Sequence, residues 1–350
     1  MLLHRNRTII AKENANYDFD YINSVEVRSS WDSLTDTATL MLPKKITYKN
    51  AFGVETQYIT GEIPIAFTGT NANKFPVFQQ GDTVSLSGGY GDDVPEVFSG
   101  YIRAIASNYP IKIDFEDAMY WLKNIFIEKK TFKNASLLEV VQFITKDCPI
   151  DIKLNVVDGV EIAELRISSV TAAYVLDHIK ETYGLVSWFR GNTLNVGLAY
   201  LSENPSEVTI HRFFASGKDV NIISTENLEW KSAEQVKIKL KLISMYNDNT
   251  KKEVTVGDLL DGELRTYYVW GVKESSLEQM ANQMLNKKVY DGYVGYFTTF
   301  LLPLVKHGDA VKLSDPDFPE REGTYLVKEV VYNYGVDGGR QKITLDTKIA

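Results

Sequence analysis

The sequence has a single cysteine, Cys148, and only four histidines in 350 residues. One cysteine excludes an internal disulfide, so nothing in the composition indicates an oxidising compartment. No stretch approaches the ~20 consecutive apolar residues that a membrane-spanning helix needs. The first residues also contain no apolar run long enough for a secretion signal. The sequence therefore predicts a soluble protein without membrane insertion and without a recognisable export signal.

Positive charge is also scarce, because 38 Lys and Arg face 46 Asp and Glu and the net charge is −8. A protein that grips nucleic acid needs a surplus of cations to neutralise phosphates, so this class is disfavoured. Aromatic residues are plentiful at 12%, with 20 Tyr, and favour half-buried β-strands. The length predicts two or three domains.

Signatures of catalysis and of metal binding are missing. The histidines show no HExxH motif and no i, i+4 pair, which disfavours zinc, and Cys148 has no His partner by spacing, which favours a buried structural thiol. We found no GxSxG and no phosphate-binding GxxxxGK[ST]. We therefore predict no catalytic, cofactor-binding or metal-ligating residues and no enzyme activity. The four histidines are His4, His178, His211 and His307.

One acidic turn leaves a question open. Residues 315–322 read DPDFPERE and bring several carboxylates close together in the sequence. Oxygen ligands at this spacing can hold calcium, but the EF-hand pattern is incomplete and acidic turns are common. The sequence alone does not decide whether this turn binds an ion. Its carboxylates are Asp315, Asp317, Glu320 and Glu322.

The N-terminal third predicts two strands, a long connection and more strands. Val25 and Val27 alternate with polar residues, and a bend at 31–35 leads to a second alternating strand that Pro43 closes. Residues 44–80 are rich in Thr, Asn and Gly and show little periodicity, which is typical of a functional or mobile connection. Strands return from residue 81, and a helical spacing follows at 118–126.

The middle third predicts an α-β-β unit written twice. The first helix starts at a capping box of Ser136 and Glu139, and a hairpin around Asp158-Gly159 follows it. The second helix runs from Thr171 to a stop at Gly184. A second hairpin is expected to turn near Gly191-Asn192.

Beyond Pro205 the pattern predicts two further strands, separated by a polar excursion over residues 246–263, and then a helix. Ser275 and Glu278 form another capping-box pattern at the start of this helix. Its apolar positions predict one buried stripe. The members of the stripe are Leu277, Met280, Ala281, Met284 and Leu285.

Two stretches of the sequence repeat each other. Residues 81–87 read GDTVSLS and residues 308–314 read GDAVKLS. In each copy a Gly-Asp turn precedes an alternating strand, a polar turn, a second strand, an Asn-Tyr pair and a third strand. Glycine accepts a positive φ and aspartate can bond its own backbone, so both pairs predict structural turns rather than ligand loops. The turn residues are Gly81, Asp82, Gly308 and Asp309. We interpret the repeat as an internal duplication.

The sequence resembles the central hub proteins of phage tail baseplates, the late control protein D family, which also includes the hub part of type VI secretion spikes. The stretches that carry this resemblance span most of the chain in order, although none of them is diagnostic alone. They are SSWDSLTDTATLMLP (29–43), GDTVSLSGGYGDDVPEVFSGYIRAI (81–105), IDFEDAMYWLKN (113–124) and HGDAVKLSDPDFPEREGTYLVKEVVYNYG (307–335).

The resemblance implies a mainly β, α+β fold with two tail-tube-like β-barrels flanking small α/β modules. The expected domains are residues 1–107, 108–205 and 206–350, the last with a flanking helix near 275–289. Three copies would place six barrels in a pseudo-sixfold ring, adapting a hexameric tail tube to a trimeric spike. The implied partners are the tail tube, tape-measure and spike proteins. DNA would pass through the channel without specific binding.

The implied location is the virion, at the tail tip or baseplate, after assembly in the bacterial host cytoplasm. The resemblance leaves open a contractile tail, a non-contractile tail or a secretion system. No spike-like continuation follows Ala350, so the needle is expected to be another chain. Net acidity would suit a channel that must not hold passing DNA.

The connection 44–80 carries six aromatic residues that its polar sequence cannot easily bury alone. We expect them to anchor the loop to a neighbouring subunit, since aromatics are favoured at interface cores. The alternative is that they pack the loop onto its own barrel. A carbohydrate-binding or adhesive β-protein that uses this loop as a sugar platform is the rival function, and a peptidoglycan-cleaving enzyme is a weaker one. The six are Tyr48, Phe52, Tyr58, Phe67, Phe75 and Phe78.

Overall fold

The structure is a computed structural model of the whole chain. The residues that it describes are 4–12, 15–19, 22–43, 45–49, 55–59, 78–106, 110–197, 208–212, 221–246, 248–272, 274–315 and 317–349. Thirteen strands form one large sheet and the other strands form four small sheets. The predicted fold class, α+β and mainly β, is confirmed.

Two groups of five strands make up most of the large sheet. In the first, each neighbouring pair is antiparallel and the order is β3-β4-β9-β8-β7. We call this group the first five-strand unit. Its strands are β3 (Ser24–Ser30), β4 (Thr37–Leu42), β7 (Thr83–Tyr90), β8 (Glu96–Ala106) and β9 (Ile111–Glu116). Two more strands, β1 (His4–Lys12) and β2 (Ala15–Phe19), extend the sheet beyond β7.

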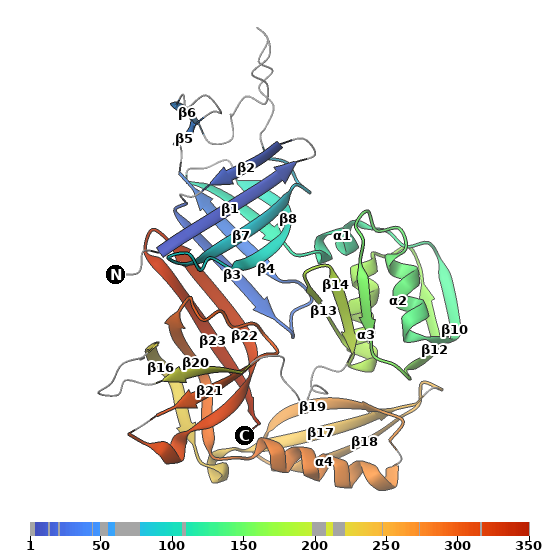
Figure 1. Cartoon of the computed structure of the whole chain (residues 1–350). Coiled ribbons are helices and arrows are strands. Elements are labelled where there is room, and N and C mark those ends of the chain that lie inside the picture. The colour runs from blue at the N-terminus through green and yellow to red at the C-terminus, as the bar shows by residue number, and fades with distance from the viewer. Residues whose placement is uncertain are drawn as a thin grey trace.

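The second five-strand unit has the order β16-β20-β23-β22-β21, and again each neighbouring pair is antiparallel. Its strands are β16 (Ile222–Lys231), β20 (Gly292–Phe300), β21 (Ala310–Ser314), β22 (Gly323–Gly335) and β23 (Gly338–Lys348). A further strand, β15 (Val208–Arg212), pairs with β21 in parallel. Figure 1 shows the blue and cyan strands of the first unit above the yellow and red strands of the second.

The two units are joined through β3 and β22, which pair antiparallel along Ser24–Ser30 and Glu329–Gly335. Buried side chains from both units, such as Leu40 and Phe297, belong to one hydrophobic cluster. We expected two separate barrels flanking the middle modules. The β3–β22 pairing instead merges the strands of both units into one sheet over one core, and no closed barrel is formed by the described strands.

The middle region holds three helices and two small sheets, drawn in green in Figure 1. The capping box of Ser136 and Glu139, the cap at Thr171 and the left-handed Gly184 at the second helix end are all confirmed. The elements are α1 (Met119–Asn124), β10 (Lys130–Ser136), α2 (Leu137–Thr145), β11 (Lys153–Val156), β12 (Glu161–Ile167), α3 (Ala172–Tyr183), β13 (Val186–Arg190) and β14 (Thr193–Gly197).

One of the two predicted hairpins is wrong. The turn at Gly159 exists, with φ at 77°, but the strands on its two sides belong to different sheets. β11 pairs in parallel with β14, and β12 pairs with β10. The hairpin that turns at Gly191-Asn192 is confirmed, because β13 and β14 pair directly with Arg190 opposite Thr193.

A third α/β module lies between β16 and β20. Its sheet has the order β18-β17-β19, and α4 packs on it through Leu277 and Ala281, two members of the predicted stripe. The elements are β17 (Ile238–Met245), β18 (Lys251–Gly257), β19 (Glu263–Trp270) and α4 (Glu274–Lys288). Because α4 begins at Glu274, the expected cap residue Ser275 lies inside the helix. The strand β18 occupies much of the stretch that we expected to be a polar excursion.

The expected domain boundaries stay a proposal, but two pairings refine them. β9 was placed in the middle region by sequence, and it pairs with β4 and β8 in the large sheet. The third module shares the middle region's hydrophobic cluster through Ile243 and Met245. Among the described residues, no helix has the length and apolar character needed to span a membrane.

Candidate functional site

The repeated Gly-Asp turns have the same geometry in both units. Gly81 and Gly308 take positive φ values of 87° and 79°. In the first turn the hydrogen bonds are Gly81 N to Ile102 O (2.9 Å), Ile102 N to Asp82 O (2.9 Å), Asp82 N to Gln79 O (3.2 Å) and Gln79 N to Asp82 Oδ2 (2.7 Å). In the second they are Gly308 N to Val327 O (2.9 Å), Val327 N to Asp309 O (2.9 Å), Asp309 N to Lys306 O (3.2 Å) and Lys306 N to Asp309 Oδ2 (3.0 Å).

The strands that follow these turns also match in register. Val84 lies opposite Gly100 in the first unit, and Val311 lies opposite Tyr325 in the second. The long middle strands then carry a register shift at the same distance from the turn. The shifts fall between Ile102 and Ala104 in β8 and between Val327 and Glu329 in β22. Since a shift bends a strand at a defined place, the two units share a local shape as well as a strand order.

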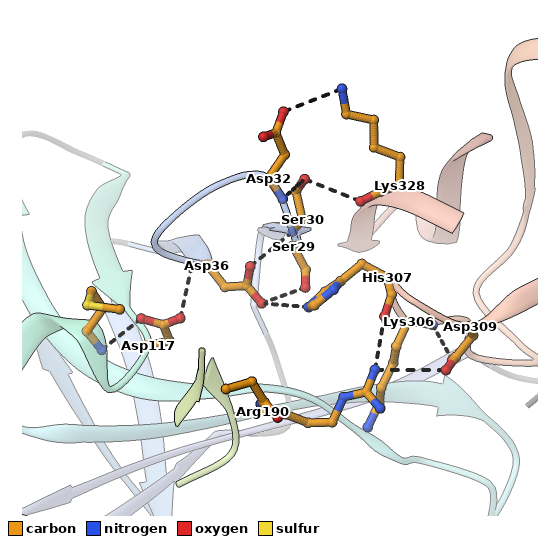
Figure 2. Close-up of polar contacts among 12 residues, drawn as sticks. Ser29, Ser30, Asp32, Asp36, Asp117, Arg190, Lys306, His307, Asp309 and Lys328 are labelled. Atoms are coloured by element: carbon orange, nitrogen blue, oxygen red, sulfur yellow. Dashed lines mark hydrogen bonds and ion pairs between the residues drawn. The ribbon is translucent and has the colours of Figure 1, made fainter. Parts of the chain in front are cut away.

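A cluster of polar groups, some buried and some partly exposed, lies where the two units and the middle region meet, and we call it the polar joint (Figure 2). Its centre is Asp36, in the turn between β3 and β4. The Asp36 carboxylate accepts hydrogen bonds from the Ser29 hydroxyl (2.5 Å) and the Ser30 backbone N–H (3.0 Å). Burial raises the pKa of Asp36 to about 6, although these two bonds and Arg190 act in the opposite direction. The joint therefore holds a carboxyl group that titrates near neutral pH.

The second unit contributes the segment before β21 to this joint. His307 is 4% exposed, and its Nε2 lies 4.0 Å from Asp36 Oδ2. Arg190, at the end of β13, donates to the His307 carbonyl (3.0 Å) and lies 3.9 Å from Asp309 Oδ1. Burial, together with the positive charges of Arg190 and Lys306, lowers the pKa of His307 to about 4. His307 is therefore neutral at neutral pH.

Asp117 ties the start of α1 to the same turn. Its carboxylate accepts from the backbone N–H groups of Asp36 (3.0 Å) and Met119 (2.9 Å). Burial raises the pKa of Asp117 well above its usual range, and the nearby Asp36 charge raises it further. The turn also reaches α3 and β22, because Asp32 accepts from Lys180 and pairs with Lys328 at 3.5 Å. The turn at 31–36 thus contacts both the middle region and the second unit.

The polar groups of the joint hold neighbouring segments of the chain in place. The carboxylates of Asp36 and Asp117 accept hydrogen bonds from backbone N–H groups, and the Arg190 guanidinium donates to a backbone carbonyl. Asp117 and Asp309 are buried, whereas Asp32 is exposed. Cys148 is half-buried, and burial raises the pKa of its thiol, so the thiol is not activated. Within the described ranges, no three His, Cys, Asp or Glu side chains lie in an arrangement that could hold a metal ion.

The acidic turn at 315–322 uses its carboxylates for its own structure. Asp315 is buried, and its Oδ1 accepts from the backbone N–H of Asp317 (3.1 Å) and Phe318 (3.3 Å). Glu322 accepts from Ser314 at 2.7 Å. Two of the four carboxylates of this turn, those of Asp315 and Glu322, thus accept hydrogen bonds within the turn itself.

The structure describes three of the six aromatic residues of the connection 44–80, two of them for the backbone only. The backbones of Tyr48 and Tyr58 lie in a small hairpin of β5 (Lys45–Lys49) and β6 (Glu55–Ile59). Phe52, Phe67 and Phe75 lie outside the described residues. Phe78 is 4% exposed and belongs to the core of the large sheet. Its assignment to a subunit interface is therefore wrong, because its ring packs inside its own chain.

Sequence analysis did not find the polar joint. Asp36 and Asp117 fall within stretches that carried the family resemblance, but a resemblance does not show which residues meet. His307 also begins such a stretch but was discussed only as one of the four histidines, and Arg190 lies just before the Gly191-Asn192 turn. Asp309 was predicted as a turn residue, and the structure adds its position beside Arg190. These residues come together only through the fold.

Solved structures of similar fold come from tail proteins and from a secretion system. A tail protein from Neisseria meningitidis MC58 superposes with a TM-score of 0.61 at 13% identity, over 98% of this chain and 96% of that chain. The 43 kDa tail protein of prophage MuSo2 from Shewanella oneidensis gives a TM-score of 0.57 at 16% identity, over 97% and 98% of the two chains.

A third similar structure is an E. coli component of the type VI secretion system, which has structural similarity to the T4 bacteriophage tail proteins gp27 and gp5. Its TM-score is 0.53 at 9% identity, over 93% of this chain and 73% of that chain. No family model and no curated protein matches the sequence. The large sheet with its α/β modules is therefore the fold of phage tail proteins and of a type VI secretion component.

Proposed function

We propose that this chain is a structural hub protein of a phage tail baseplate or a related contractile injection machine. Three copies form a ring in which each chain supplies two equivalent five-strand units. Such a ring presents six similar units to a hexameric tail tube while it keeps the threefold symmetry of a trimeric spike. The tube, tape-measure and spike proteins are the partners, and the virion tail tip is the location.

The observation that carries this proposal is the equivalence of the two units. They share their strand order, the register of the strands that follow the Gly-Asp turns and the position of one register shift, between Ile102 and Ala104 in the first unit and between Val327 and Glu329 in the second. A duplicated unit explains this agreement better than independent origin, since the turn hydrogen bonds also correspond one to one. The similarity of the fold to that of tail proteins supports a location in a phage tail. The role is geometric and includes no catalytic step.

Net acidity supports a channel through which DNA passes unbound. With a net charge of −8, the chain has no cation surplus to neutralise phosphates. Like charges also repel, which lowers the affinity of an acidic lumen for nucleic acid.

Native mass spectrometry of the purified chain tests the proposal. The expected species is a trimer, at three times the monomer mass of 39.6 kDa. A chain that stays monomeric at tens of micromolar and binds to a glycan array would contradict the hub and favour the carbohydrate-binding alternative.

A further inference from the structure

Among the described strands, β8 has a neighbour on only one side near its end. β7 covers its first part, from the Ser87–Glu96 pair to the Thr83–Tyr101 pair. β9 covers its other side as far as Ala106. Beyond Tyr101, no described strand pairs with β8 on the β7 side. An uncovered stretch of this kind is a template for pairing with another strand.

The matching stretch of the second unit is covered. Ile102 and Val327 make the same bonds to their Gly-Asp turns, so Ala104, Ile105 and Ala106 correspond to residues 329–331 of β22. Those residues of β22 pair with β3 of the first unit. The β22–β3 pairing is therefore an example, within the chain, of the strand contact that the end of β8 does not make with any described strand.

Burial shows the consequence of the missing neighbour. Ile105 lies opposite Ile113, and Val330 lies opposite Ile343, so both occupy the row of the sheet that faces the core. Val330 is 0% exposed, whereas Ile105 is 39% exposed. A β-branched side chain on a core-facing row gains hydrophobic stabilisation when it is covered. The first unit thus exposes a position that the second unit buries.

The strand that would cover it is also identifiable. β16 corresponds to β3, because each is the first strand of its unit and pairs with the second. Leu40 lies opposite Ile113 and Phe297 lies opposite Ile343, so the preceding residues, Thr39 and Tyr296, correspond to each other. Thr39 pairs with Glu26 and Tyr296 pairs with Asn227, so Glu26 of β3 corresponds to Asn227 of β16. β3 pairs with β22 on its other side, whereas β16 ends the large sheet of the described strands.

We propose that the end of β8 in one copy pairs antiparallel with β16 of the next copy, reproducing the β22–β3 junction between chains. The register of that junction places Ala106 opposite Glu229, Ile105 opposite Trp230 and Ala104 opposite Lys231 of the neighbouring chain. This inference rests on the proposed function and names its subunit contact. Each chain offers one β8 edge and one β16 edge, so the contact is head-to-tail and closes into a ring when the rotation per chain allows.

Disulfide trapping tests this register on the full chain. In a Cys148→Ser background, Ala106→Cys is combined with Glu229→Cys, and the protein is oxidised and run on a denaturing gel without reductant. Residues opposite each other in antiparallel strands have Cα atoms ~4.5–5.5 Å apart, which suits a disulfide. The matched control combines Ala106→Cys with Ile223→Cys, an exposed β16 position several residues away. We expect at least a tenfold higher yield of covalent dimers and trimers than in the control.

A second pair of variants probes the same edge without cysteines. Ile105→Lys should weaken trimer formation at least tenfold in native mass spectrometry, because it places a charge in the strand junction. Leu138→Lys is the control, since Leu138 on α2 is similarly exposed, at 41%, and lies away from both edges. Equal effects of the two substitutions would overturn the junction.

The outcomes separate this inference from the proposed function. A trimer by mass whose cross-linking does not exceed the control overturns the β8–β16 junction and leaves the hub intact. Efficient cross-linking into ladders longer than three supports the junction and contradicts the three-chain ring. A monomer without cross-links contradicts both.

Discussion

The two five-strand units share a frame and differ in what is inserted into it. Between the first and second strands, the first unit has only the short turn at 31–36, whereas the second unit carries the third α/β module. Between the second and third strands the first unit has the longer insertion. It carries residues 43–82 there, whereas the second unit has only residues 301–309. Loops can change freely while the sheet register is kept, since register is fixed by the buried face.

The difference in loops also explains where the polar joint lies. The short turn of the first unit, at 31–36, lies against α3 through Asp32 and against the segment before β21 through Asp36. The two Gly-Asp turns consequently have different surroundings, although their own hydrogen bonds match. Asp309 is 5% exposed and lies beside Arg190, whereas Asp82 is part of an exposed turn.

The largest predicted effect tests whether the units share one core. Leu40 and Phe297 occupy corresponding positions, opposite Ile113 and Ile343, and both are fully buried. Leu40→Ala should cost about 2–5 kcal/mol and Phe297→Ala about 3–5 kcal/mol of unfolding free energy. Because both side chains belong to one cluster, each variant should still unfold in urea as one transition, with signals from both units coinciding. Two separate transitions would show independent units.

The next effect concerns the pH dependence of the polar joint. Asp36 has a pKa of about 6, raised from 3.8, so its protonation stabilises the folded state fully below pH ~4, and this contribution is lost as the pH rises through 6. His307 has a pKa of about 4, lowered from 6.5, so its contribution is present above pH ~6.5 and is lost as the pH falls through 4. In the natural protein these two contributions oppose each other between pH 4 and 6.

Single variants should separate these two contributions. Asp36→Asn removes the Asp36 contribution, so the free energy of unfolding should fall, relative to that of the natural chain, on acidification from pH 6.5 to 4. His307→Gln removes the His307 contribution, so the free energy should rise, relative to that of the natural chain, over the same range. The comparison with the natural chain cancels the titration of Asp117, which remains in both variants. Each change should be on the order of 2–3 kcal/mol, at ~1.4 kcal/mol per pKa unit. Urea titrations of both variants and of the natural chain across this range measure the two differences, and differences of the same sign would refute the assignment.

The smallest predicted losses of unfolding free energy are those of substitutions in the two Gly-Asp turns. Asp309→Ala should cost about 1–3 kcal/mol, because it leaves a backbone N–H without its acceptor in a buried setting. Asp82→Ala should cost about 0.5–1.5 kcal/mol, since water can replace the carboxylate at the exposed turn. Thermal unfolding of the two variants beside the natural chain gives this ranking. A larger loss of stability for Asp82→Ala than for Asp309→Ala would contradict this ranking and show that burial in the polar joint does not stabilise the Gly308-Asp309 turn.

Local signals in the sequence predicted local structure well. The capping box at Ser136, the cap at Thr171 and the left-handed Gly184 each act within one helix end, so a few letters suffice. The alternation at Val25 and Val27 likewise predicted a strand with one buried face. The equivalence of the two turns was visible in the sequence because both contain a Gly-Asp pair before an alternating strand.

The pairing between strands that lie far apart along the chain could not be predicted from the sequence. The turn at Gly159 was predicted, but not that β11 would turn away to pair in parallel with β14. The merging of two expected barrels depends on β3 meeting β22, about 300 residues apart along the chain. The polar joint needs Asp36, Arg190 and His307 from three separate parts. Such contacts are set by the whole fold and leave no local pattern.

Cryo-electron microscopy of the assembled chain tests the central claim most directly, because it displays the arrangement of five-strand units around the axis. We predict a ring of three chains in which six similar five-strand units, two from each chain, surround one channel. A ring in which only one unit of each chain faces the channel, with the other directed outward, would contradict the claim that the two units are equivalent.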